Sequence, residues 1–375
     1  MESMATPERL NKITRRDFLK MTLLGIGALG GAVLFPEITE AMINASFPDS
    51  FEGLRVAPTF PLPRELQGLL INSPFLWCYP NIQSQTLAHL QSAGTANLRL
   101  FADDRIEPNI GKYNTEAVGA LQSLHTTIEK QVGGSPNTIV SLYDSYGMKI
   151  RENPVYGKNT ITSPYCDGSS ESYRQFFTEK GLRKSFLQRA DMLIDTLGGS
   201  SAVGAWEVGN EFVPPEGPDG HAIFQDWYLE VMDTIHEKDK TRPIITGVDR
   251  PWHLDERDID IPNVINSIHI YPPFLFGNLH AFLHSEGRRL PLFVEETGFP
   301  ERLLGVDLPS SVADVEYNNF IHKIVRSATF GDKVEMDSLG LWKVDGYDDG
   351  YPDPLALPLT RATIGSFVAA AGREM

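Results

Sequence analysis

The chain alternates short apolar runs with longer amphipathic stretches from about residue 65 onward, and this pattern constrains its fold more than any other feature. Continuous apolar runs are typical of strands that are buried on both faces of a parallel sheet. Eight runs are predicted to be strands, at 68–73, 96–101, 138–144, 203–209, 243–248, 264–271, 290–296 and 338–344. Eight strand–helix units predict an α/β fold that closes into a single-domain (β/α)8 TIM barrel. An open doubly wound sheet is disfavoured, because no Gly-rich phosphate turn follows an early strand.

The stretches between the runs predict helices, most clearly at 116–131, 172–197, 223–237 and 311–330. Within 172–197, apolar residues recur at the 3.6-residue spacing of an amphipathic helix. The loop before it, 145–170, is long and rich in Gly, Pro, Asn, Tyr and Ser. It follows the third predicted strand and so belongs to the barrel face where active sites form. It either shapes a substrate cleft there or is a solvated insertion.

The composition limits the partners that this chain can have. Its 375 residues carry a formal net charge of −16. Nucleic-acid binding needs a basic face, so no nucleic-acid partner is expected, whereas a neutral polysaccharide is compatible with this charge. The only two cysteines, Cys78 and Cys166, cannot provide a disulfide framework or a cysteine metal cluster. They either pair with each other or remain two separate buried thiols.

The N-terminal segment has the pattern of a targeting signal. Paired arginines, Arg15 and Arg16, precede a Gly-rich apolar run at 21–35, which is too short for a convincing membrane span. This arrangement resembles a twin-arginine export signal, which a translocase reads. Residues 1–45 are therefore predicted to be a signal peptide, followed by one barrel domain at 46–375. The protein is expected to be exported to the periplasm or the extracellular space, unless the segment stays attached as an anchor helix.

Two of the predicted strands end in carboxylates. The run at 206–211 ends in Asn210-Glu211, and the run at 293–298 contains Glu295-Glu296. Burying a carboxylate without a partner costs several kcal/mol, so an acid at the end of an apolar run is expected to have a use. A pair of acids from two distant strand ends is what retaining glycoside hydrolysis requires, because one protonates the leaving oxygen and the other attacks the anomeric carbon.

Other strand ends carry polar and aromatic residues. On the second strand, Arg99 alternates with apolar neighbours, and on the sixth, His269 and Tyr271 alternate with isoleucines. Because successive side chains on a strand point to opposite faces, these three should point into the barrel. The eighth strand ends in Trp342 and Lys343.

Together these motifs resemble glycoside hydrolase clan A, and within it family five, the cellulase family, with the β-mannanases as the most similar members. The resemblance covers about residues 65–370. It implies a secreted retaining β-glycoside hydrolase that uses double displacement and acts in endo fashion on β-1,4-mannan or a related β-1,4-linked polysaccharide. It also implies that Glu296 is the nucleophile and Glu211 the acid/base. The family has an aromatic residue where this chain has Thr297. Glu295 and Glu207 are expected to have structural or supporting parts.

The resemblance further implies which side chains surround the acids. Asn210 resembles the residue that hydrogen-bonds the sugar 2-hydroxyl. Arg99 and Tyr271 resemble the groups that keep the nucleophile ionised and oriented. His269 resembles a histidine that binds sugar or orients the acid, and Trp342 resembles the aromatic platform beneath the sugar at the point of cleavage.

Other functions remain open at this stage. One is an endoglucanase or another β-glycosidase of the same clan, and another is a non-catalytic carbohydrate-binding barrel, which would tolerate loss of either acid. A metal-dependent hydrolase or a lyase would need a His-x-His motif or a strand-end lysine, for which Lys343 is the only candidate. No His/Cys/Asp spacing predicts a metal site, no cofactor is expected, and the protein is expected to be a monomer.

Overall fold

The computed structural model describes residues 66, 68–81, 83–92, 97–133, 137–145, 148, 163–248, 253–254, 260–270 and 292–297, and the backbone of short strands at 152–153, 157–158, 302–303, 306–307, 329–330, 333–334 and 336–342. All of these except Ile270 belong to one compact unit, formed by Leu54–His269 and Leu290–Met375. The predicted export signal, the loop positions 146–147, 149–151, 154–156 and 159–162, and nearly all of the predicted helix at 311–330 lie outside the described residues.

The described residues form a nine-stranded sheet in the order β8-β7-β6-β3-β2-β1-β15-β10-β9. In this order, each strand from β8 through β10 pairs in parallel with the next. The strands are β1 (Gly68–Asn72), β2 (Asn97–Phe101), β3 (Thr138–Ser141), β6 (Val203–Glu207), β7 (Ile244–Ile245), β8 (Val264–Ile265), β9 (Ser267–Ile270), β10 (Leu292–Thr297) and β15 (Met336–Trp342).

The two ends of this sheet are two halves of one strand. Only Asn266 separates β8 from β9, so the sheet closes on itself as a barrel of eight strands. Each of the eight predicted runs overlaps one of these strands, except that the run at 264–271 contains both β8 and β9, and the predicted (β/α)8 fold is confirmed. Three antiparallel hairpins lie outside the barrel: β4 (Glu152–Asn153) with β5 (Gly157–Lys158), β11 (Arg302–Leu303) with β12 (Val306–Asp307), and β13 (Thr329–Phe330) with β14 (Lys333–Val334).

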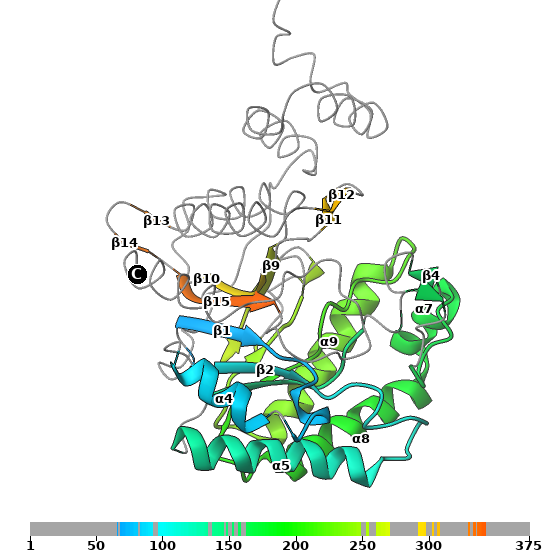
Figure 1. Ribbon diagram of the computed structural model, residues 1–375. Helices are drawn as coiled ribbons and strands as arrows, with labels where there is room; N and C mark the ends of the chain where they lie inside the picture. The colour runs from blue at the N-terminus through cyan, green and yellow to red at the C-terminus, as the bar shows by residue number, and fades with distance from the viewer. Residues whose placement is uncertain are drawn as a thin grey trace, which may run out of the picture. The chain divides into compact units, whose positions relative to one another are not determined.

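Helices follow the first four barrel strands (Figure 1). They are η2 (Leu76–Cys78), α4 (Gln83–Ser92), α5 (Thr115–Val132), α7 (Ser170–Thr178), α8 (Lys180–Leu197) and α9 (Gly220–Lys238). The sequence explains the ends of α5. The Asn114 side chain accepts from the backbone N–H groups of Glu116 and Ala117, and Gly133 ends the helix in the left-handed region at φ 88°. In the described residues, no helix is both long and apolar enough to span a bilayer.

The prediction of one continuous helix at 172–197 is wrong. The chain breaks at Glu179, whose extended backbone (φ −79°, ψ 120°) separates α7 from α8. The buried side chains of α7 are Tyr173, Phe176 and Phe177, whereas α8 buries a stripe that begins at Phe186. On a straight helix these two stripes would point roughly 100° apart. The break lets both pack into the same aromatic cluster.

The barrel interior is layered. A buried apolar layer contains Leu66, Leu70, Ile139, Ala205, Ile245, Ile265 and Phe293. Because side chains alternate along a strand, the next inward position lies two residues further along. On six strands these positions are Asn72, Ser141, Glu207, Gly247, Ser267 and Glu295. Apart from Gly247, which has no side chain, every residue of this second set has a fully buried side chain. The interior therefore changes from apolar to polar toward the carboxyl ends of the strands, where TIM-barrel sites form.

Candidate active site

Arg99 is the centre of the polar layer. Its side chain is fully buried, and its Nε and Nη2 donate to the two carboxyl oxygens of Glu207 at 2.6 and 2.8 Å. Its Nη1 donates to Glu296 Oε2 at 2.8 Å and to Asn72 Oδ1 at 2.9 Å, and Nη2 also donates to Asn210 Oδ1 at 2.9 Å. One guanidinium from β2 thus holds side chains from β1, from β10, and from β6 and the loop after it. Arginine suits this part because its planar fork offers five fixed donors.

Glu295 and Glu296 both point toward Arg99 although they are consecutive residues. On a regular strand one of them would face the helices. The pairing of β10 with β15 is irregular between Val294 and Thr297, where β10 advances by three residues and β15 by two. Such a bulge accommodates one extra residue, and this allows both carboxylates to enter the barrel. Arg99 Nε lies 3.1 Å from Glu295 Oε1, while Nη1 holds Glu296.

Glu211 occupies a strained position just beyond β6. Its φ is 52°, a left-handed value that is uncommon for a residue with a side chain. Its backbone N–H donates to the carbonyl of Gly247 at 2.9 Å. Gly247 itself has φ 67°, and a Cβ there would collide with the carbonyl oxygen of Gly209 and lie 2.6 Å from Glu207 Oε1. Glycine is therefore required at 247 by both conformation and space.

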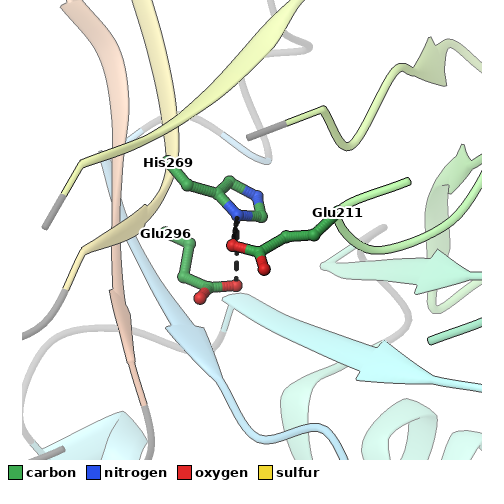
Figure 2. Close-up of side chains that lie close together, drawn as sticks. All are labelled: Glu211, His269 and Glu296. Atoms are coloured by element: carbon green, nitrogen blue, oxygen red, sulfur yellow. Dashed lines mark hydrogen bonds and ion pairs between the residues drawn. The ribbon is translucent and has the colours of Figure 1, made fainter. Parts of the chain in front are cut away.

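His269 connects Glu211 to Glu296, as Figure 2 shows. Its Nδ1 lies 2.8 Å from Glu211 Oε1 and 3.6 Å from Glu296 Oε2, and its Nε2 lies 3.6 Å from Glu295 Oε2. Burial alone would lower the pKa of His269, but the carboxylates of Glu296, Glu211 and Glu295 raise it to about 10. The ring is therefore an imidazolium at neutral pH, and Nδ1–H donates to Glu211.

The separation of the two candidate acids limits the chemistry that they could perform. An oxygen of Glu211 and an oxygen of Glu296 lie within 4.8 Å of each other. Inverting glycosidases need a gap of about 6.5–9.5 Å for a water molecule, whereas retaining enzymes hold the two carboxyl groups about 5–5.5 Å apart. The Glu211 side chain is 17% exposed and that of Glu296 is 5% exposed, so solvent reaches both, unlike the fully buried Glu207 and Glu295.

These two acids and His269 also have a spacing that a metal ion could use, because one ligand atom from each lies within 4.8 Å of the others. Two cationic groups oppose this use. Arg99 donates to Glu296 at 2.8 Å, and the His269 imidazolium has a proton on the nitrogen that faces Glu211. A divalent cation would have to displace that proton beside a buried guanidinium. The charges therefore favour acid–base chemistry at this trio.

Glu207 and Glu295 lie deeper in the barrel than the candidate acids. Both side chains are fully buried, and each contacts Arg99. Burial raises the pKa of Glu207 to about 8, and the facing Glu295 carboxyl adds to that shift. Although Glu295 is equally buried, Arg99 and His269 lower its pKa to about 2. Since two facing acids titrate as a pair, the two together keep one proton at neutral pH.

An aromatic cluster anchors the segment that bears Glu211. Phe212, the next residue, stacks on Phe176 with ring centroids 5.7 Å apart and meets Trp227 edge-on at 4.9 Å. Phe212 also stacks on Tyr143, the residue before Asp144, at 6.3 Å. These contacts join the segment after β6 to α7, α9 and the end of β3, and so fix the backbone on which Glu211 is strained.

A second buried cation anchors the loop after β2. Arg189 of α8 donates to the carbonyls of Leu142, Ala102 and Asp103, and its Nη1 lies 3.2 Å from Glu107 Oε2. Tyr165 donates to the same Glu107 oxygen at 2.5 Å. This network satisfies loop carbonyls that would otherwise be buried without a donor, and it accounts for a charged residue inside the predicted amphipathic helix.

The structure brings together five of the seven residues that the sequence nominated: Arg99, Asn210, Glu211, His269 and Glu296. Tyr271 lies outside the described residues. Trp342 is the last residue of β15 and pairs with Asn72 of β1, but its side chain also lies outside the described part. Cys78 and Cys166 form no disulfide bond, so the open question of their pairing is resolved against a disulfide.

Sequence reasoning missed three residues that support the site. Asn72 accepts from Arg99 and donates through Nδ2 to the carbonyl of Glu295 at 3.0 Å. Ser141 donates to Glu207 Oε1 at 2.8 Å, and Asp144 accepts from Asn210 Nδ2 at 3.0 Å. Asn72 and Ser141 could have been found, because each lies two residues after an apolar residue that points into the barrel.

Comparison with known proteins agrees with this architecture. No family model matches the sequence, and no curated protein matches it. Among solved structures, the endo-1,4-β-D-mannanase of Thermotoga petrophila RKU-1 superposes with a TM-score of 0.58 at 13% identity, over 82% of this chain and 100% of that one. A glycoside hydrolase family 5 mannosidase from Rhizomucor miehei gives 0.57 at 16% identity, over 85% and 95% of the two chains.

A third similar structure, the endo-glycoceramidase II of a Rhodococcus species, gives a TM-score of 0.53 at 14% identity, over 82% of this chain and 81% of that one. At these identities the likeness establishes the fold. The chain thus has the (β/α)8 barrel that these glycoside hydrolases share, as its sequence motifs predicted. The three neighbours are named for different glycosidic substrates, so the fold alone does not identify the substrate of this chain.

Proposed function

We propose that this chain is a retaining β-glycoside hydrolase of clan A, family five, in which Glu296 is the nucleophile and Glu211 the acid/base. The observation that carries the proposal is the pair itself. The two acids extend from the ends of β6 and β10, approach within 4.8 Å, and lie in different surroundings. Glu296 receives a hydrogen bond from the buried Arg99, whereas Glu211 receives one from His269.

These surroundings suit two successive displacements. A buried guanidinium at 2.8 Å favours the anionic form of Glu296, which a nucleophile needs. Glu296 attacks the anomeric carbon while Glu211, protonated through its hydrogen bond with His269, gives that proton to the departing glycosidic oxygen. Glu211 then removes a proton from the incoming water, which attacks the same carbon and breaks the bond to Glu296. Each step transfers one proton and exchanges one bond at the anomeric carbon. Because each displacement inverts that carbon, the two together release the sugar with its original configuration.

His269 and Asn210 complete this site in the proposal. The short hydrogen bond from His269 holds Glu211 in place against the strain of its backbone. Asn210 is held at both ends of its amide, by Arg99 at Oδ1 and by Asp144 at Nδ2. We assign the second hydrogen of Nδ2 to the 2-hydroxyl of the sugar, where a hydrogen bond that strengthens in the transition state would contribute to catalysis.

For the substrate, we propose a β-1,4-mannan or a related β-1,4-linked polysaccharide, cleaved internally. The support is the mannanase-like motif pattern and the similarity to the structures of a mannanase and a mannosidase. A β-1,4-glucan is the second candidate within the same mechanism. Incubating the purified protein with mannan, glucan and xylan, and following the products by chromatography, tests this directly. Release of manno-oligosaccharides supports the proposal. Cleavage of glucan alone would favour the second candidate, and cleavage of none would contradict a hydrolase.

We also propose that residues 1–45 direct export through the twin-arginine pathway. The support is the Arg15-Arg16 pair ahead of a Gly-rich apolar run. Fusing 1–45 to a fluorescent reporter that folds in the cytoplasm, with and without replacement of both arginines by lysine, tests this. Export of the first fusion and retention of the second are expected. Equal export of both would contradict the proposal.

A further inference from the structure

Two fully buried carboxyls face each other beneath the proposed nucleophile. Glu207 from β6 and Glu295 from β10 lie 2.6 and 3.1 Å from the same Arg99 nitrogen, Nε. Two negative charges held this close in a buried site repel each other strongly, and the two cations beside them, Arg99 and the His269 imidazolium, also serve Glu296 and Glu211. This crowding is relieved if one of the two facing groups is uncharged.

The donors around the pair are distributed unequally. Glu207 accepts from Arg99 Nε, from Arg99 Nη2 and from the Ser141 hydroxyl. Among the described residues, the donors near Glu295 make only ion-pair contacts, from Arg99 Nε at 3.1 Å and His269 Nε2 at 3.6 Å, and neither of its two buried oxygens accepts a hydrogen bond. Buried acceptors without a donor are rare in folded proteins. A proton on Glu295 converts one of these oxygens into a donor aimed at Glu207.

We propose that Glu207 and Glu295 share one proton, carried on Glu295, and that this pair is a positioning element that leaves Arg99 Nη1 free to hold Glu296. With that proton the pair has a charge of −1 instead of −2, which reduces the repulsion around Arg99. The raised pKa of Glu207 agrees with one proton on the pair, whereas Arg99 and His269 lower the pKa of Glu295, so the distribution of donors alone assigns the proton to Glu295. The other charged groups that face the pair are Glu296 of β10 and His269 of β9, whose Nε2 lies 3.6 Å from Glu295 Oε2.

Glutamine replacements at the two positions distinguish the members of the pair. In Glu295→Gln, the amide N–H takes the place of the carboxyl O–H toward Glu207, and the amide oxygen can accept from Arg99 Nε. In Glu207→Gln, an amide N–H group must face the donors of the Arg99 fork. The first variant reproduces the proposed state, whereas the second destroys it. Both are measured in the full chain, beside the wild type.

The decisive readout is the dependence of unfolding on pH, because it does not require any substrate. A carboxyl whose pKa is raised to about 8 in the folded state stabilises the protein fully below its ordinary pKa, and this stabilisation is lost as the pH rises through about 8. Glu295→Gln removes this titration. Its melting temperature should therefore fall less than that of the wild type between pH 5 and about pH 8. An unchanged fall would overturn the shared proton.

Activity on an aryl β-glycoside provides a second readout. The kcat/KM of Glu295→Gln should fall at least about tenfold less than that of Glu207→Gln, because an amide donor replaces a protonated carboxyl. That of Glu207→Gln should fall about 100-fold or more, because it leaves Arg99 without its fork partner. The opposite order would overturn the placement of the proton on Glu295. A wild type without activity would contradict the proposed hydrolase but would leave the unfolding test of the pair intact.

Discussion

Arg99 Nη1 lies 2.8 Å from Glu296 Oε2, while the other two nitrogens of the same guanidinium hold the two oxygens of Glu207. The position of the proposed nucleophile is therefore tied through one buried cation to the end of a strand on the other side of the barrel. The fork fixes the plane of the guanidinium, and that plane directs Nη1 at Glu296. Interactions that fix a carboxylate before substrate arrives are the kind that lower an activation barrier.

Replacing Arg99 by lysine keeps the charge but removes the fork. We expect Arg99→Lys to lower the free energy of unfolding by about 3–5 kcal/mol, since it leaves buried carboxylates without their partner. The kcat of the variant should fall more than its stability alone explains. Urea unfolding and steady-state kinetics check both. Arg174→Lys is the control, because its ion pair with Asp219 is partly exposed and contributes at most about 1 kcal/mol. Equal effects of the two replacements would contradict the account.

Gly247 permits a matched test of the backbone that supports Glu211. Gly247→Ala would strain a left-handed residue and would also press a Cβ against Gly209 and Glu207. Gly133 is the control: its φ is also left-handed, at 88°, but a Cβ there meets nothing within 4 Å. We expect Gly133→Ala to cost about 1–3 kcal/mol of stability with unchanged kcat. Gly247→Ala should cost more and should lower kcat as well. Urea unfolding and steady-state kinetics of both variants test this expectation. A fully active Gly247→Ala would contradict the idea that the backbone at Gly247 holds Glu211 in place.

The raised pKa of His269 predicts a pH dependence of stability. The carboxylates raise its pKa from 6.5 to about 10, so its contribution is fully present below about pH 6.5 and is lost as the pH rises through about 10. The melting temperature of His269→Asn should therefore lie furthest below that of the wild type at pH 6, and the gap should narrow toward pH 10. In His221, burial lowers the pKa, so His221→Asn should not show this narrowing. A gap for His269→Asn that stays constant across this range would mean that the ring is neutral.

The sequence predicted most of the site because the period of a strand is regular. Arg99 and His269 point inward as the alternation required, and Asn210 and Glu211 extend from the end of their strand. The same rule fails at Glu295 and Glu296, where it would place one acid outside the barrel. The bulge in β10 depends on the pairing with β15, a tertiary relationship that no local pattern reveals.

Other features also depended on long-range packing. The left-handed backbone of Glu211 follows from the carbonyl of Gly247 and from the packing of the neighbouring Phe212 on Trp227, and both partners come from other elements of the fold. The break at Glu179 was foreseeable in principle, because the buried faces of the two helical segments are out of phase. The amphipathic pattern was interpreted as one helix because each segment matches the helical period by itself.

The consecutive acids allow a direct comparison of their roles. Glu296→Ala should lose about 10³-fold or more of its turnover of an aryl β-glycoside, and azide should restore part of it by attacking from the vacated space. Glu295→Gln alters the neighbouring carboxyl and should retain activity without azide. Rates with and without the anion, and identification of a glycosyl azide product, are the measurements. Azide rescue of a Glu295→Ala variant, with an active Glu296→Ala, would reverse the assignment.

The central claim is that Glu296 forms a covalent bond to the sugar. The most direct test incubates the wild-type protein with 2-deoxy-2-fluoro β-mannosyl and β-glucosyl donors that carry activated leaving groups. Such donors slow the second displacement more than the first and so accumulate the intermediate. Mass spectrometry of the intact chain and of its peptides then locates the label. The account predicts one fluoroglycosyl group on Glu296. A label on Glu295, or hydrolysis with inversion and no label, would contradict it.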